Sequence, residues 1–148
     1  MSISLDRAMV GKEFDRTVFA SITEAQILAY AAAYGETNPL YTDPAAAAGG
    51  PHGGLIAPPT FAVSLRGSHF MPRELPRNFG RNGFDAGKDI EIGAPIRVGD
   101  VLTGSSTVHD IYEKTGRSGT MTFIVFRTTV SNQHGEMVAV VDQKMMFR

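Results

Sequence analysis

Residues 120–131 have the sequence TMTFIVFRTTVS. β-Branched and aromatic side chains dominate this run, and such residues favour β-strands. Successive side chains of a strand point to opposite faces, so Ile124 and Phe126 would lie on one face of this strand. Phe123 and Val125 would lie on the other. Because both faces are apolar, the sequence predicts a strand in a sheet that is covered on both sides. We expect a helix of the same chain to cover one side and a second subunit to cover the other.

Similar runs, each bounded by turn residues, occur on both sides of this segment. They predict further strands over 88–92, 101–112 and 137–147, and a first strand over 12–19. The tetrapeptide NQHG at 132–135 is typical of a short hairpin loop, with glycine where φ is positive. Consecutive antiparallel strands that are joined in this way form a meander.

Helical patterns occupy the first half of the chain. The tetrapeptide SITE at 21–24 has the composition of a capping box, and apolar residues then recur at helical spacing up to Tyr34. This pattern predicts one amphipathic helix over 23–34, and Gly35 supplies a left-handed stop.

The segment that follows is a loop in this interpretation, apart from one short helical turn. Residues 36–57 are dense in Pro, Gly, Ala and Asp, and only 44–48 could form a turn of helix. Residues 58–65, PPTFAVSL, then begin with prolines, which the first turn of a helix tolerates. The segment is apolar nearly all round, so it predicts a buried helix that extends over 58–66.

Length and composition fit one α+β domain over residues 1–148, in which a strongly curved antiparallel sheet wraps around a central buried helix. The chain has 148 residues, 43% of them apolar, and a net charge of −1, which suits a single core. We find no run long enough for a membrane span and no signal-peptide pattern at the start, so we expect a soluble, cytoplasmic protein. Cysteine is absent, which excludes thiolate nucleophiles and disulfides. The four histidines have no metal-ligand spacing, so we expect neither metal nor cofactor.

Basic residues gather in one stretch, 66–88, which contains five of them against two acidic residues. This excess suits a phosphorylated small molecule or an acidic partner, and a solvated loop is the simpler alternative. The net charge of −1 is unlike the strongly basic balance of nucleic-acid-binding domains, so we expect no nucleic-acid partner.

Three spaced motifs resemble the MaoC-like hot-dog dehydratases. They are GETNPLYTD at 35–43, GLIAPPTF at 54–61 and VGDVL at 98–102. The chain is similar above all to the branch called the MaoC dehydratase N-terminal or FAS1-like dehydratase domain, and the resemblance extends from about Val10 to Arg148. It implies a hot-dog fold and the reversible hydration of trans-2-enoyl thioesters to (R)-3-hydroxyacyl thioesters carried on CoA or acyl carrier protein.

The resemblance also points to two altered catalytic positions. Active members carry a G-D-x-N-P-x-H motif whose Asp and His hold the water that adds across the double bond. Glu36 stands at the Asp position here, and Tyr41 at the His position. Glu36 keeps a carboxylate on a longer side chain, which displaces the base by about an ångström and lowers the rate roughly a hundredfold. Tyr41 has a phenol with an ordinary pKa of about 10, so it accepts protons poorly at pH 7 but still donates hydrogen bonds.

Several readings of these positions stay open. Glu36 could act as the sole base while Tyr41 orients the water, or both residues could simply order the loop. His52, in the tract GGPHGG, is the candidate substitute for the missing histidine, and an exposed loop histidine is its simpler interpretation. The resemblance further implies that amides at the start of the buried helix polarise the thioester carbonyl. From the excess of basic residues in 66–88, we predict that Arg73 and Arg77 contact CoA or the carrier protein. The candidate substrate-binding residues are Asn38, Gly54, Ile56, Ala57, Pro59, Thr60, Arg73 and Arg77.

With the usual pair altered, the sequence favours a dehydratase or hydratase subunit that depends on a catalytic MaoC-type partner, in a homodimer or heteromer that acts on an acyl-CoA or acyl-carrier-protein thioester. The alternative is a non-catalytic acyl-thioester-binding or structural hot-dog protein. A hot-dog thioesterase is less favoured, because such enzymes place a carboxylate on or beside the central helix, whereas residues 58–66 contain no Asp or Glu.

Overall fold

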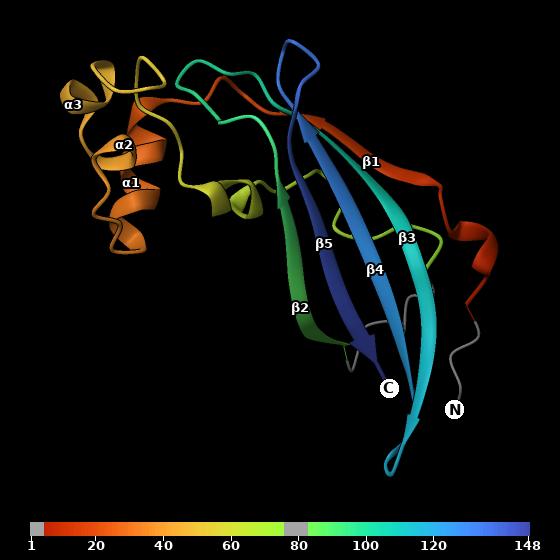
Figure 1. Ribbon diagram of the computed structural model, residues 1–148. Coiled ribbons are helices and arrows are strands. Elements are labelled where there is room, and N and C mark those ends of the chain that lie inside the picture. The colour runs from red at the N-terminus through yellow and green to blue at the C-terminus, as the bar shows by residue number, and fades with distance from the viewer. Residues whose placement is uncertain (1–4, 76–82) are drawn as a thin grey trace.

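The computed structural model describes residues 5–75 and 83–148. Its framework is a five-stranded antiparallel sheet with the strand order β1-β3-β4-β5-β2. The long strands twist together into the curved sheet of Figure 1. A strand is found at each of the five predicted positions, and β3, β4 and β5 follow one another as the expected meander. The strands are β1 (Glu13–Val18), β2 (Gly83–Ile92), β3 (Thr103–Gly116), β4 (Gly119–Ser131) and β5 (Met137–Phe147).

Strand β2 begins at Gly83, five residues before its predicted start at residue 88. The turn-forming residues in this part of the sequence are accommodated by an irregularity in the pairing with β5 between Asp85 and Lys88. Gly87 lies inside it with a φ of 111°, which glycine adopts without strain. A bulge, rather than a turn, therefore explains the glycine.

Helix α1 (Glu24–Ala33) is the helix predicted over 23–34. Its capping box differs from the one expected at 21–24. Thr23 is the N-cap, its side chain accepts a hydrogen bond from Gln26 N, and the Gln26 side chain accepts one from Thr23 N. The pattern was right and the register wrong, because glutamine serves at the third helical position as well as glutamate does.

Two short helices follow where the sequence predicted a loop over 36–57. Helix α3 (Pro44–Ala48) is the expected single turn, and Asp43 caps it. Helix α2 (Pro39–Thr42) was not expected. Its four residues are too few to show a helical period, but Asn38 is an N-cap and Pro39 occupies the first helical position.

The central helix departs most from expectation. Instead of a buried helix over 58–66, the chain forms a 3₁₀ helix, η2 (Pro59–Ser64), of six residues. Phe61 and Ala62 are buried, whereas Thr60 is exposed. The apolar composition of 58–66 fits either kind of helix, and 3₁₀ helices occur in short pieces.

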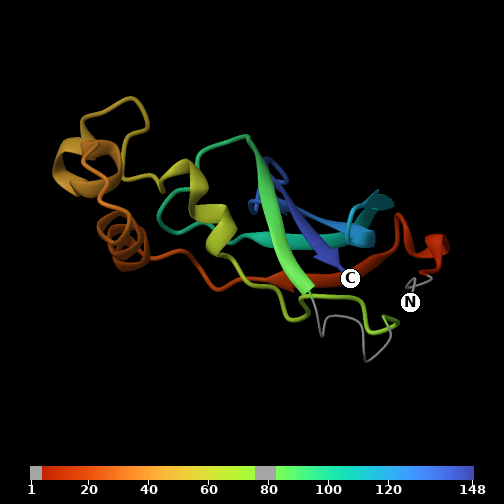
Figure 2. The same ribbon diagram turned by 90° about the horizontal axis from the view of Figure 1, so that it is seen from below.

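Two hydrophobic clusters hold these elements together. One joins α1, α3 and η2 to the near end of the sheet, and the other lies under η1 (Arg7–Met9) towards the far end. Figures 1 and 2 show α1, α2 and α3 gathered beyond one end of the sheet, with η2 between them and the strands. Among the described helices, none combines the length and apolar character needed to cross a bilayer.

Candidate functional site

The loop after α1 is held in place by backbone and capping hydrogen bonds. Asn38 Oδ1 accepts a hydrogen bond from Leu40 N at 3.0 Å, which begins α2 and so places Tyr41. Leu40 O in turn accepts a hydrogen bond from Ile56 N at 3.1 Å. Asn38 therefore has a positioning role at the start of α2, and α2 is tied to the segment that leads into η2.

The same segment is tied on its other side to the chain that follows β2. Ala57 N donates to Ile96 O at 2.8 Å, and Ile56 forms an isolated bridge with Arg97. The Arg97 guanidinium also donates to the backbone carbonyl of His52. These bonds place the segment containing His52 beside the segment after β2.

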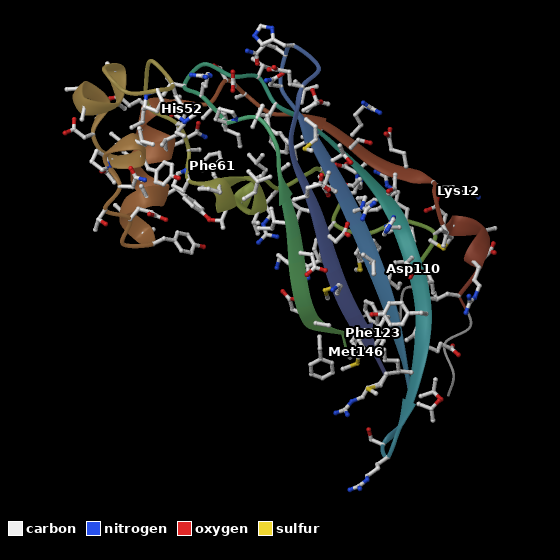
Figure 3. All side chains as sticks on the ribbon, in the orientation of Figure 1. Lys12, His52, Phe61, Asp110, Phe123 and Met146 are labelled. Carbon is white, nitrogen blue, oxygen red and sulfur yellow. The ribbon has the colours of Figure 1, made fainter. Side chains whose placement is uncertain are left out.

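An apolar cleft of about 200 Å³ lies between these two segments. Five residues singled out in the sequence line it: Tyr41, His52, Ile56, Ala57 and Pro59. Pro58 completes this wall, and the opposite one consists of Ile92, Gly93, Ala94, Pro95, Ile96 and Val138. In Figure 3, His52 belongs to the helical group beyond the sheet, and Phe61 marks η2 beside it. The structure thus gathers residues from four separate stretches of the chain.

The cleft has few polar side chains. Among the described residues that line it, only Tyr41 and His52 carry a titratable group, and no carboxylate does. Both side chains are half-buried. The phenol and the imidazole can donate hydrogen bonds to a ligand, while the remaining walls can only pack against apolar groups.

Glu36 does not line this cleft. Its backbone N–H donates to Ala31 O at 2.9 Å, and Gly35 has a φ of 67°. This is the Schellman pattern at the end of a helix, and it confirms Gly35 as the stop of α1. Within the described ranges, no hydrogen bond or ion pair involves the Glu36 carboxylate. Burial raises the pKa of Tyr30, with smaller contributions from Tyr34 and Glu36, and the hydrogen bond with Thr60 acts in the opposite direction.

The start of η2 offers little to a thioester carbonyl. Pro58 and Pro59 have no N–H, and Phe61 N already donates to Pro58 O at 2.9 Å. Thr60 provides the first N–H of this helix. Its hydroxyl lies 2.8 Å from Tyr30 Oη, and neither Thr60 nor Gly54 lines the cleft. The sequence had implied several amides where the structure has one.

Arg73 lies elsewhere, in a group that the sequence did not reveal. Its Nη2 is 2.6 Å from Nε2 of His69, and His69 Nδ1 is 3.0 Å from Oδ1 of Asp15. Arg77, the other predicted contact for CoA, lies outside the described residues. Fifty-four residues separate Asp15 from His69, and no local pattern connects them.

We call Asp15, Thr17, Ser68 and His69 the Asp15 cluster. Thr17 Oγ1 donates to Asp15 Oδ2 at 2.8 Å, Ser68 N donates to Thr17 Oγ1 at 3.0 Å, and His69 N donates to Asp15 Oδ1 at 3.1 Å. Burial would raise the pKa of Asp15, but the hydrogen bonds from Thr17 and from the ring and backbone of His69 outweigh it and lower the pKa. The cluster fastens the chain after η2 to β1. No set of three His, Asp or Glu side chains within residues 5–75 and 83–148 could hold a metal ion.

The chain is similar to curated proteins along nearly its whole length. A model of the family described as "FAS1-like, dehydratase domain region" matches residues 8–141. A UPF0336 protein of Streptomyces coelicolor is 29% identical over 150 residues, which cover 99% of this chain and 97% of that protein. A UPF0336 protein of Parafrankia sp. is 31% identical over 143 residues, with coverage of 91% and 89%.

Solved structures share the fold. The (R)-hydratase from A. caviae involved in PHA biosynthesis has a TM-score of 0.70 at 24% identity, covering 97% of this chain and 98% of that one. The C-terminally truncated HadBC (3R-hydroxyacyl-ACP dehydratase) complex from Mycobacterium tuberculosis has a TM-score of 0.74 at 22% identity, with coverage of 94% and 97%. The MaoC-like dehydratase from Rhodospirillum rubrum has a TM-score of 0.69 at 26% identity, covering 93% of this chain and 90% of that one. The predicted α+β hot-dog fold is confirmed.

Proposed function

The chain belongs to the FAS1-like dehydratase domain region family and has the MaoC-like hydratase/dehydratase fold, and from this premise we propose that it is a non-catalytic, acyl-thioester-binding subunit of a heteromeric dehydratase. The assembled enzyme would interconvert (R)-3-hydroxyacyl and trans-2-enoyl thioesters, with the catalytic Asp and His supplied by a MaoC-type partner. We further propose that residues 1–148 form one hot-dog unit of that assembly.

One observation carries this proposal: among the described residues, the cleft lining contains a phenol and an imidazole but no carboxylate. Hydration of an enoyl thioester requires a base that takes a proton from water as the oxygen attacks C3. It also requires a donor that returns a proton to C2 of the enolate. Tyr41 is a poor proton acceptor at neutral pH, and Glu36 is absent from the lining. The apolar walls can pack against an acyl chain, but they supply no group for these proton transfers.

The remaining candidates take supporting roles in this proposal. Ile56, Ala57 and Pro59 pack against the acyl chain, and Asn38 positions the helix that carries Tyr41. The Thr60 N–H and the backbone at Gly54 lie on the approach to η2 and would meet the thioester there. Arg73 and Arg77 are proposed to meet the phosphates of CoA or the acidic surface of a carrier protein.

The position of the cleft favours a partner. Within the described residues, β2 pairs with β5 and with no other strand, so one of its edges is open. Ile92 lies at the end of β2, lines the cleft and is 55% exposed. A second subunit that covers this edge would also complete the cleft. Two of the structurally similar solved structures are of complexes between different chains, namely HadBC and ChsH1-ChsH2 from M. tuberculosis.

The test compares the chain alone with the chain in an assembly. When the purified chain alone is given crotonyl-CoA or a longer enoyl-CoA, we expect no hydration. Hydration is measured as the loss of enoyl-thioester absorbance. The chain is then co-expressed with a MaoC-type protein that is encoded beside it and that carries an intact G-D-x-N-P-x-H motif. We expect the two proteins to form a stable complex with hydratase activity. If co-expression gives neither a stable complex nor activity, the proposed partner is refuted. Turnover by the chain alone that disappears in Glu36→Gln would refute the non-catalytic role.

A self-sufficient hydratase is the second candidate, because Tyr41 and His52 line the same cleft. In that case His52 would accept the proton from water while Tyr41 holds the water in place. The same assay separates the two proposals. The second predicts turnover by the chain alone, abolished in His52→Gln and retained in Glu36→Gln.

A further inference from the structure

A second, smaller cavity of about 100 Å³ lies at the other end of η2. The cleft described above touches η2 at Pro59, whereas this pocket touches Ala62 and Val63 and is roofed by the chain that follows them. Its floor is the inner face of the sheet. The side chains there come from three adjacent strands: Ser106 of β3, Thr128 of β4 and Gln143 of β5. We call it the inner pocket.

The floor of the inner pocket is polar where a sheet normally presents its core. Ser106 and Thr128 are paired across β3 and β4, and their hydroxyl oxygens are 2.8 Å apart. On one side of them lies the cluster that includes Val130, and on the other lies the cluster that includes Phe126. Polar side chains at core-facing positions are less stabilising than apolar ones. Such local departures from core patterning are typical of functional sites.

The ionisable side chains that line the inner pocket are all basic. Arg66, His69 and Lys88 line it, and no carboxylate does among the described residues. Lys88 Nζ is 3.0 Å from Asp85 Oδ2, and His69 is held by Asp15 of the Asp15 cluster. Arg66 has no ion pair within residues 5–75 and 83–148. The lining therefore carries close to one uncompensated positive charge.

The walls are aromatic and aliphatic. Phe14, Phe70, Phe126 and Val141 surround the polar floor. The space of about 100 Å³ is several times the roughly 10–15 Å³ that admits one water, so it suits a small organic molecule. An anionic head and a short apolar body would use both parts of this lining.

We propose that the inner pocket binds a short aliphatic carboxylate, with its carboxylate near Arg66, Lys88 and the paired hydroxyls and its alkyl chain against Phe126 and Val141. A single negative charge matches the one uncompensated cation. Doubly charged phosphate would leave one charge unmatched beside apolar walls, which favours the carboxylate. The inference does not rest on the proposed dehydratase role, because the pocket is separate from the cleft and needs no thioester.

The test is a titration of the whole isotope-labelled chain with butyrate, followed by NMR at the amides of Phe126 and Val141. We expect saturable shifts with a dissociation constant of about 1 mM, as befits so small a ligand. Butyramide, which has the same shape without the charge, should bind at least tenfold more weakly, and so should inorganic phosphate.

Variants assign the binding to the pocket. Arg66→Gln should weaken butyrate binding about tenfold, and Thr128→Val, which preserves side-chain volume, about fivefold. Lys114→Gln is the matched control, because Lys114 lies on the aromatic pair Tyr112 and Phe123 and does not line the pocket. Equal binding of butyramide or phosphate would overturn the assignment. Butyrate binding that weakens as much in Lys114→Gln as in Arg66→Gln would also overturn the assignment, as would the absence of shifts at the amides of Phe126 and Val141.

Discussion

Two regions of this molecule place a histidine among polar groups, and they are built in opposite ways. In the Asp15 cluster, His69 sits between a buried carboxylate at 3.0 Å and the Arg73 guanidinium at 2.6 Å. In the cleft, His52 has a phenol in the same lining and no carboxylate. The carboxylate–imidazole pair, which resembles a general base, is thus in the region that fastens a loop. The region suited to an acyl group has no such pair. The carboxylate–imidazole pair borders the small inner pocket through His69, whereas the cleft that suits an acyl group contains no such pair among the described residues.

The largest effect should come from removing the carboxylate of the Asp15 cluster. Asp15 accepts hydrogen bonds from Thr17 Oγ1 and from the backbone and ring of His69, and its side chain is 3% exposed. We expect Asp15→Ala to lower the free energy of unfolding by about 3 kcal/mol, because buried donors lose a charged acceptor. Urea denaturation measures this.

Glu36→Ala is the matched control, because Glu36 lies outside the Asp15 cluster. Within the described part of the chain, no hydrogen bond or ion pair involves the Glu36 side chain, so we expect a change within about 0.5 kcal/mol. Similar losses in the two variants would contradict the contrast between the regions.

A glycine packed against the Asp15 cluster provides a smaller, steric test. A Cβ built at Gly67 would clash with Asp15 Oδ2, whereas one built at Gly54 would have nothing within 4 Å. We expect Gly67→Ala to destabilise the protein by about 2 kcal/mol, because the loop must shift away from β1. Gly54→Ala should change stability by less than about 0.5 kcal/mol. Equal thermal unfolding temperatures for the two variants would show that the loop tolerates the shift.

The strands were predictable because alternating apolar runs need only local sequence. β4 and β5 lie within a residue of their predicted bounds. The start of β2 was not predictable, because a bulge at Gly87 and a turn have similar composition. Helix η2 was misjudged because apolar composition does not distinguish a long buried helix from six 3₁₀ residues that bury only part of their surface.

The candidate site was predictable only in part. A family motif marked Tyr41, and His52 was chosen for its place in the glycine-rich loop, but their common cleft depends on the hydrogen bond from Ile56 N to Leu40 O, which no spacing reveals. Asp15 and His69 meet through chain reversal over 54 residues. One signal existed for the inner pocket: the threonine at 128 separates Phe126 from Val130 on the inner row of β4, where both of these apolar residues are buried.

The pH dependence of stability should also separate the two regions. The pKa of Asp15 is lowered in the folded protein by its hydrogen bonds, so its contribution is fully present above the ordinary aspartate pKa of about 3.9. It is lost as the pH falls from there through the lower pKa of the folded state. We expect unfolding measured between pH 6 and pH 2 to show a weaker acid dependence in Asp15→Asn than in the wild-type chain. An unchanged dependence in this variant would assign the acid sensitivity to other carboxylates.

The smallest effects should come from the polar groups of the cleft. If Tyr41 only donates a hydrogen bond to substrate, Tyr41→Phe in the assembled enzyme removes one neutral hydrogen bond of about 0.5–1.5 kcal/mol. That energy corresponds to a loss in kcat/KM of between about twofold and tenfold. His52→Gln, which keeps a donor in the cleft, should fall in the same range. Substitution of the partner's motif His should remove activity by several orders of magnitude, because that residue handles the proton. A loss of a thousandfold in Tyr41→Phe or His52→Gln, with the complex intact by gel filtration, would instead place the chemistry in this chain. Tyr41 or His52 would then take part in the proton transfers that we propose for the partner's Asp and His.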